Sequence, residues 1–402
     1  SVLTPLKLYK LYEQTFCYKR RAGFSSEIDT NQSTSVWPAL QSITLKQLQS
    51  GLEINPKGWV FFHESTDQWT SGAIEKLAHW QAQHPAAKII SFDEIHISDA
   101  TPQIEPWLKP QWNVDLFLSS AYQGHSVIFR ADLLVILLSK ITLENLVSVD
   151  ELVDTLLLVL MAKYPHEYQS WIAHCPFAAL QVNKPVLSQT EKAHWKTTRR
   201  HRILDLLKVD VAPVEAEGRL GLSWRLHWPI PNPPPLVSLC IPTRNGLEVL
   251  QPCLESILQL TRYKHFEILV IDNQSDCPQT LQYLTQISEQ DKRVRVLRYD
   301  APFNFAEISN FAVAQAQGEV IGLVNNDIEP CHAEWLEEML AQVLRPDVGC
   351  VGAKLYYPSG TIQHGGVVLG IGGVAGHAFR FESAYSSGYQ GRLGVAQNYS
   401  AV

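Results

Sequence analysis

The sequence from residue 235 onward alternates short apolar runs with segments of helical periodicity, and this alternation restricts the fold more than any other feature. The apolar runs are rich in β-branched residues and cover residues 237–241, 266–271, 294–297 and 320–324. Strands separated by helices imply right-handed crossovers and a mainly parallel sheet. The second half of the chain is therefore predicted to be an α/β unit.

The proline-rich run at residues 229–235 marks a boundary, because such a run sustains neither a helix nor a central strand. A basic helical pattern at 191–208 precedes it and indicates a solvated linker helix or, alternatively, a contact with an anionic membrane surface. The predicted division of the chain is an N-terminal segment at 1–50, a first α/β unit at 51–190, a basic helix and linker at 191–234, and a second unit at 235–402.

Composition narrows the class of protein and its compartment. The formal net charge of −7 over 402 residues argues against nucleic acid as the main partner. No apolar run reaches the roughly 18–20 residues that cross a bilayer, and 152–161 is better interpreted as a buried helix. Seven cysteines, Cys17 among them, form no CxxC pair, which is typical of reduced thiols. We expect a cytoplasmic protein, or one that lies peripherally at the inner face of the plasma membrane.

Polar clusters follow three of the four predicted strands. The clusters contain Thr243, Arg244 and Asn245 after the first strand, Asp272 and Asn273 after the second, and Asn325, Asn326 and Asp327 after the fourth. In an open α/β sheet, ligands bind beyond the carboxyl ends of the strands. If the strands are parallel, all three clusters open into one crevice.

The residue types in these clusters suit a nucleoside diphosphate. Asp272 can accept a hydrogen bond from a ring N–H of a nucleobase. Asp327 supplies a hard oxygen for Mg²⁺ or Mn²⁺, which keeps waters and takes phosphate oxygens to complete its shell. Such an ion offsets the charge of a diphosphate and stabilises it as it leaves. The site therefore favours group transfer from a nucleotide donor.

The segments 237–246, 266–276 and 318–327 resemble the three signature segments of the family-2 glycosyltransferases, which are inverting enzymes of the Rossmann-like GT-A fold. The resemblance implies that Thr243, Asn245 and Asp272 hold the nucleoside, and that Asn325 to Asp327 are a variant of the DxD motif. It also places Asn310 near the nucleotide, where the usual preceding Arg is Ser309 here. The segment around Asn304 and the run 352–377 are similar to a subgroup that makes bacterial surface polysaccharides, such as rhamnosyl- or O-antigen transferases.

The resemblance implies an inverting transfer of a sugar from a UDP-, dTDP- or GDP-sugar to a growing glycan or lipid-linked acceptor at the cell surface. The family's catalytic base is an acidic residue on a later segment. We expect it beyond Val402, so that the chain is a fragment and inactive alone, and no residue is assigned as the base. The donor sugar, the acceptor and the oligomeric state are not predicted.

The first half resembles the same subgroup more weakly. Gly58 to Asp67 has the spacing of Gly318 to Asp327, and the stretches 91–94, 109–112 and 122–125 are similar to the first unit of two-unit members. No strand ending in a Thr/Asn cluster is predicted before Gly58. An internal duplication is therefore expected, with a degenerate, scaffold-like first unit or one that keeps a role in acceptor binding.

Two histidines, His364 and His377, flank a glycine-rich loop at 370–376 and are weaker candidates for acceptor or metal contact. One rival function is a sugar-1-phosphate nucleotidyltransferase, which would need a glycine-rich basic loop after the first strand, where the chain offers only Arg244 and Gly246. The other is a non-catalytic glycan-binding or scaffold protein, against which the retained Asp272 and Asp327 speak.

Overall fold

The computed structural model describes residues 40–98, 101–183, 188–214, 223–370 and 373–402, which form two compact units. The first unit contains the described residues up to Leu226 together with Lys354–Ala401, and the second contains His227–Ala353 with Val402. Cys17 and residues 1–39 of the predicted N-terminal segment lie outside the described residues, as do residues 371–372 of the glycine-rich loop.

The second unit is built on a parallel sheet, as predicted. Its strands are β10 (Val237–Thr243), β11 (Phe266–Asp272), β12 (Val294–Arg298) and β13 (Val320–Leu323), in the order β12-β11-β10-β13. All three pairings are parallel, and Thr243 pairs with Asp272 in register. The carboxyl ends of β10 and β11 therefore lie side by side.

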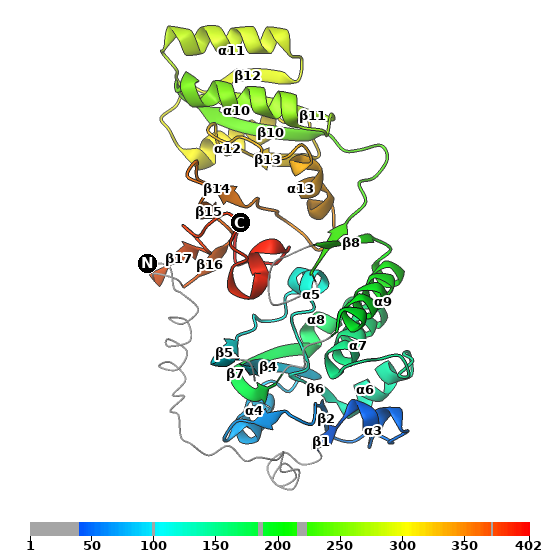
Figure 1. Cartoon of the computed structure of the whole chain (residues 1–402). Coiled ribbons are helices and arrows are strands. Elements are labelled where there is room, and N and C mark those ends of the chain that lie inside the picture. The colour runs from blue at the N-terminus through cyan, green and yellow to red at the C-terminus, as the bar shows by residue number, and fades with distance from the viewer. Residues whose placement is uncertain (1–39, 99–100, 184–187, 215–222, 371–372) are drawn as a thin grey trace. The chain divides into compact units, whose positions relative to one another are not determined.

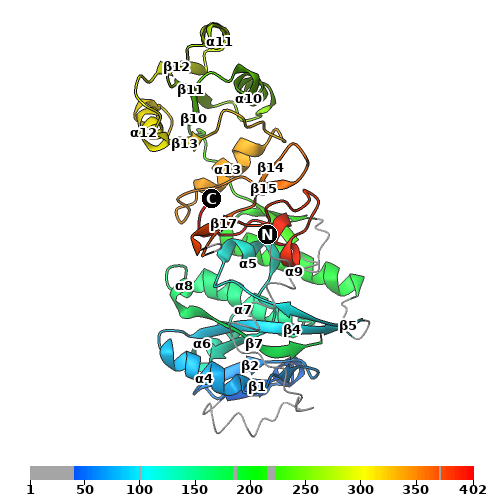
Figure 2. The same ribbon diagram turned by 90° about the vertical axis from the view of Figure 1, so that its left-hand side faces the viewer.

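Helices cover both faces of this sheet. Successive residues of a strand point to opposite sides, and the apolar strands β10 and β11 therefore present side chains to be buried on both faces. Leu239 and Ile241 of β10 pack toward α10 (Leu247–Leu260), α11 (Pro278–Gln290) and α13 (Trp335–Val343). Cys240, between them, packs toward α12 (Phe305–Gln315) with Ile271. Figure 2 shows α10 and α12 on opposite sides of the sheet.

The first unit has a mixed sheet of seven strands. They are β1 (Leu40–Ile43), β2 (Trp59–Phe62), β3 (Gln68–Trp69), β4 (Ile89–Ser98), β5 (Thr101–Trp107), β6 (Val127–Arg130) and β7 (Ile172–Val182), in the order β1-β2-β6-β4-β7-β3 with β5 beside β4. The pairs β1–β2 and β4–β7 are parallel and the others antiparallel. A strand thus precedes Gly58, but Thr44 at its end caps a helix through the backbone N–H of Gln47.

Seven helices accompany this sheet in the described part of the first unit. They are α3 (Leu45–Gln49), α4 (Ala73–Gln83), α5 (Val114–Ser120), α6 (Ala131–Leu138), α7 (Val149–Lys163), α8 (Tyr168–Trp171) and α9 (Gln189–Leu207). Figure 1 shows α4 on one side of the sheet and α6, α7 and α9 on the other. No helix in the described ranges is both long and apolar enough to cross a membrane.

The basic helix α9 packs into the first unit, whereas the sequence predicted a linker there. Its Arg199 is fully buried and forms an ion pair with Asp154 of α7 at 2.9 Å. Arg200 and Arg202 pair with Asp210 and Glu151. The ion pair fixes α9 against α7, because a buried guanidinium needs a carboxylate partner. Three basic side chains of α9 are thus paired with acidic residues of the protein. The strands β8 (Asp210–Val214) and β9 (Ser223–His227) pair after it.

Residues 354–401 end the first unit with two small antiparallel pairs and a short 3-10 helix. The elements are β14 (Leu355–Tyr356), β15 (Ile362–His364), β16 (Val367–Leu369), β17 (Ala375–His377) and η2 (Tyr389–Gly394). Figure 1 shows this segment, in orange and red, beside α5. The predicted second unit, 235–402, is therefore divided between the two compact units.

Candidate functional site

The three polar strand ends of the second unit meet, as the sequence predicted. The side chain of Asn326, after β13, donates a hydrogen bond to the hydroxyl of Thr243 at 3.1 Å. After β11, the hydroxyl of Ser275 accepts from the backbone N–H of Asn245 at 2.7 Å. One continuous edge therefore presents the loops after β10, β11 and β13.

Asp272 is buried at the end of β11, with both carboxylate oxygens already engaged. Its Oδ1 accepts from the backbone N–H of Ser275 at 3.0 Å, and its Oδ2 accepts from Arg298 at 2.7 Å. Arg298 was not among the predicted site residues, yet it stands opposite Asp272 in the β11–β12 register. A carboxylate offers about four acceptor positions, so Asp272 keeps capacity for a nucleobase N–H.

Asn245 clamps two loops together. Its Oδ1 accepts from the backbone N–H groups of Asp276 and Cys277, both at 3.0 Å, and its Nδ2 donates to the Asp276 carboxylate at 2.8 Å. Its φ of 52° lies in the left-handed region that Asn tolerates better than most residues. The nucleoside contact predicted for Asn245 stays a prediction, since the amide is used within the protein.

Two further predicted residues organise the backbone nearby. Asn273 donates from its Nδ2 to the carbonyls of Tyr299 and Ala301, at 3.1 and 2.8 Å. Its Oδ1 is buried and has no hydrogen-bond partner among the described residues. Asn304 is the N-cap of α12 and accepts from the N–H groups of Ala306 and Glu307. Both side chains therefore fix the loop that leads from β12 into α12.

Four predicted residues remain open to solvent at or near this edge: Arg244, Asn310, Asn325 and Asp327. Within the described ranges, none of their side chains has a hydrogen-bond or ion-pair partner. Donors and acceptors in this state are available to a ligand without first breaking a protein contact. The site thus combines a fixed inner set of side chains with an available outer set.

Asp327 suits a divalent cation whose remaining ligands are waters and substrate phosphates. No group of three or more His, Cys, Asp or Glu residues in the described part of the chain could hold a metal alone. Mg²⁺, however, is commonly bound through one or two carboxylates while waters and substrate phosphates complete its shell. The exposed carboxylate of Asp327, unpaired among the described residues and close to Asn326 at the polar edge, meets that requirement.

His364 and His377 contact each other in the first unit. Their Nδ1 atoms lie 2.8 Å apart across β15 and β17. Burial lowers the pKa of His364, and the neighbouring His377 lowers it further. In this hydrogen bond one Nδ1 donates and the other accepts, so at least one Nδ1 carries no proton. Each Nδ1 therefore has the other ring as its hydrogen-bond partner. Their predicted acceptor or metal contact stays a prediction.

The first unit places Asp67, the counterpart of Asp327, in a buried ion pair. Its Oδ2 lies 2.7 Å from Nε2 of His125, whose Nδ1 lies 2.6 Å from Asp150. Burial would lower the pKa of His125, but Asp150 and Asp67 offset this and raise the pKa to about 10. His125 is therefore an imidazolium at neutral pH, and Asp67 serves as its counter-ion.

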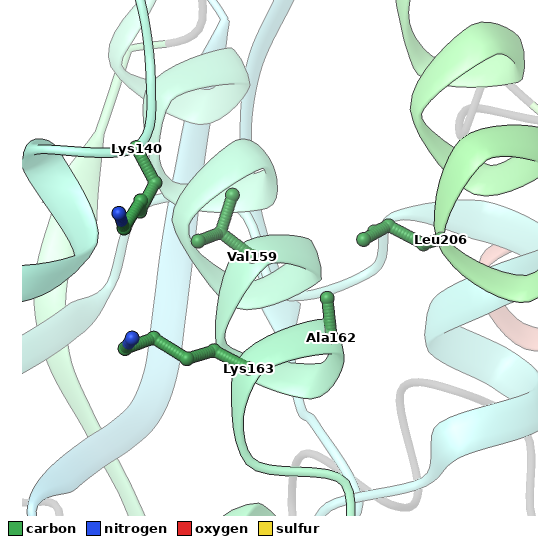
Figure 3. Close-up of a pocket in the computed structure, with 5 residues that line it drawn as sticks. All are labelled: Lys140, Val159, Ala162, Lys163 and Leu206. Atoms are coloured by element: carbon green, nitrogen blue, oxygen red, sulfur yellow. The ribbon is translucent and has the colours of Figure 1, made fainter.

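A surface hollow of about 310 Å³ lies elsewhere in the first unit. It is lined by Lys140, Val159, Ala162, Lys163 and Leu206. Figure 3 shows the two lysine side chains on the same side of α7, with Leu206 reaching in from α9. None of the predicted site residues lines it.

A family model described as Glycosyl transferase family 2 matches residues 238–387. An uncharacterised protein of Sinorhizobium fredii, y4gI, is 38% identical over 359 residues, which are 88% of this chain and 39% of that protein. The O-antigen biosynthesis protein RfbC of Myxococcus xanthus is 29% identical over 80% of this chain and 24% of its own length. The chain thus spans well under half the length of these relatives.

Among solved structures, the mannosyltransferase PcManGT from Pyrobaculum calidifontis, in complex with GDP-Man and Mn²⁺, is 20% identical over 31% of this chain and 39% of that chain, with a TM-score of 0.28. The family match covers the parallel sheet, its three polar strand ends and the exposed Asp327. Residues 238–387 of the chain therefore form a domain that matches glycosyl transferase family 2.

Proposed function

We propose that the domain at 238–387 binds a nucleoside-diphosphate sugar at the edge formed by the loops after β10, β11 and β13, and transfers the sugar with inversion. The observation that carries the proposal is the joining of Thr243, Asp272 and Asn326 at one edge, next to the unpaired carboxylate of Asp327. The acceptor is proposed to be a cell-surface glycan, which the name of RfbC supports.

The inner residues would recognise the nucleoside and the outer residues the diphosphate. Asp272, held by Arg298 and Ser275, presents a carboxylate whose orientation is fixed before ligand binds. A fixed acceptor loses little conformational freedom on binding, which favours selectivity for a ring N–H. Arg244 and Asn310 are exposed donors suited to phosphate and ribose oxygens.

Asp327 would hold a Mg²⁺ or Mn²⁺ ion together with phosphate oxygens. When bound, such an ion supplies charge stabilisation to the departing diphosphate. Asp327 is exposed and has no ion-pair partner among the described residues, so binding the ion breaks no contact. A nucleotidyltransferase is less favoured, because the loop after β10 offers Arg244 as its single cation.

Calorimetric titration with UDP, dTDP and GDP, each with and without Mn²⁺, tests the proposal. Wild type should bind one of the three in an Mn²⁺-dependent manner, and Asp327→Asn should weaken that binding at least tenfold. Asp347→Asn is the matched control, because Asp347 is a half-exposed surface carboxylate of the same unit. Binding of equal strength with and without metal, in wild type and in Asp327→Asn, would contradict the assignment.

A further inference from the structure

Residues 354–401 have too small a core of their own to fold independently. Ile362 and Leu393 are the buried apolar side chains in the described part of this segment. Chains below about 40 residues usually need further support, and domains of about 60 residues are only marginally stable. The segment must therefore obtain its order from a surface outside itself.

The first contact with such a surface is made by η2. The hydroxyl of Tyr389 accepts a hydrogen bond from the backbone N–H of Leu108 and donates one to the carbonyl of Pro106, both at 2.8 Å. Arg392 donates to the carbonyl of Leu108 at 2.8 Å. Three polar backbone groups, one at the end of β5 and two on the residue after it, are thus satisfied by two side chains of the C-terminal segment.

The second contact is made by Asn398 with the start of α5. Its backbone N–H donates to Oδ1 of Asn113 at 3.0 Å, and its carbonyl accepts from Nδ2 of Asn113 at 2.8 Å. Its side chain donates to the carboxylate of Asp115 at 2.6 Å and accepts from the Asp115 backbone at 3.3 Å. This reciprocal pairing fixes both the position and the register of the segment.

The surface that receives these contacts is rigid for reasons internal to the first unit. Lys109 is buried, donating from its backbone to Asp93 at 2.7 Å and from Nζ to Glu94 at 2.8 Å. The hydroxyl of Tyr122 accepts from the backbone N–H of Asn113 at 3.1 Å. Asp93, Glu94, Lys109 and Tyr122 belong to the stretches 91–94, 109–112 and 122–125, whose sequence resemblance pointed to the first unit of two-unit members.

We propose that residues 106–115 of the first unit, held by Lys109 and Tyr122, are a docking platform for residues 389–398. The first unit thereby positions the final part of the family-2 domain, since residues 354–387 lie in both the family match and the first unit. Its retained motifs serve this platform and do not form a second transfer site. The docking of residues 389–398 is inferred from the contacts described above. Its role in sugar transfer depends on the proposed function.

Hydrogen exchange on the complete chain tests the platform. Tyr389→Phe and Asn398→Ala each remove two of the contacts, so each should speed exchange within 354–401 by about tenfold, because losing two ordinary hydrogen bonds shifts a local opening equilibrium by roughly that factor. Exchange at β10 and β11 should not change. Tyr385→Phe is the matched control, since Tyr385 is 97% exposed.

Tyr122→Phe perturbs the platform from the first unit's own side, because it removes the hydroxyl that accepts from the backbone N–H of Asn113. It should speed exchange at both 106–115 and 389–398. Unchanged exchange at 389–398 in this variant and in the double variant Tyr389→Phe/Asn398→Ala would overturn the proposal, and so would an equal increase in both units. Titration with nucleotide and Mn²⁺ on the same samples separates the two proposals, because a wild type that binds no nucleotide contradicts the proposed function and leaves the exchange result intact.

Discussion

Asp67 of the first unit and Asp327 of the second follow parallel-paired strands at the same distance from a glycine, yet their surroundings are opposite. The pair β1–β2 corresponds to the pair β10–β13. Asp67 is 2% exposed and neutralises the imidazolium of His125. Asp327 is exposed and has no such partner in the described residues. The same local pattern thus produces a structural counter-ion in one unit and an available ligand in the other.

The neighbouring strands explain the divergence. In the second unit β11 and β12 lie beyond β10 and bring Asp272, Ser275 and Arg298 to the polar edge. In the described part of the first unit no strand pairs with the far side of β1. On the function proposed above, a carboxylate at a strand end serves a nucleotide site only where adjacent strands supply the remaining contacts. In the first unit, residues 106–115 instead contact the segment 389–398.

The largest effect that would sharpen this comparison is on stability. Asp67→Asn leaves the buried imidazolium with one carboxylate, and breaking a buried ion pair costs roughly 3–5 kcal/mol. Asp327→Asn should cost less than about 0.5 kcal/mol, as is usual at exposed sites. Native-state hydrogen exchange at β2 and β6 measures the stability loss in Asp67→Asn, and exchange at β10 and β13 measures the loss in Asp327→Asn. Asp132→Asn, which changes an exposed carboxylate of the first unit, is the control.

Nucleotide titration of the same variants examines the comparison from the functional side. Asp67→Asn should retain one nucleotide site per chain with unchanged affinity under conditions where it is folded, because Asp67 cannot reach a ligand. A stoichiometry near two in wild type, or loss of binding in Asp67→Asn without unfolding, would show that the first unit is itself a nucleotide site.

Alkaline pH should affect the first unit through His125. Its pKa rises from about 6.5 in the unfolded chain to about 10 in the folded protein. The stabilisation is therefore complete below pH 6.5 and is lost as the pH rises to about 10, when the folded imidazolium releases its proton. Urea titrations of wild type and His125→Gln should show a gap in unfolding free energy that is wide at pH 6 and narrows by pH 10. A gap that stays constant would show that His125 is neutral in the folded protein.

The sequence predicted the second unit better than its site. Its strands were recognisable because apolar, β-branched runs end abruptly in polar residues, and parallel pairing then brings those ends together. Arg298 was missed because its role depends on the β11–β12 register, which no local pattern specifies. The burial of Asp67 was missed for a related reason, since His125 and Asp150 are distant in sequence. The assignment of 354–401 to the first unit likewise depends on side chains as far apart as Asn113 and Asn398.

The smallest effect concerns Asn245. The predicted nucleoside contact and the observed clamp lead to different changes in nucleotide affinity and in stability when this residue is replaced. Asn245→Gly removes the amide and tolerates the φ of 52°, whereas Ala would add backbone strain. If Asn245 acts through the clamp, the loop of Asp276 and Cys277 loosens, and nucleotide affinity should fall only about two- to fivefold while stability falls by about 1 kcal/mol. Calorimetry and urea titration together measure both. A hundredfold loss of affinity with unchanged stability would instead show that the amide leaves the clamp to bind the nucleoside, and that the inner residues of the site rearrange on binding.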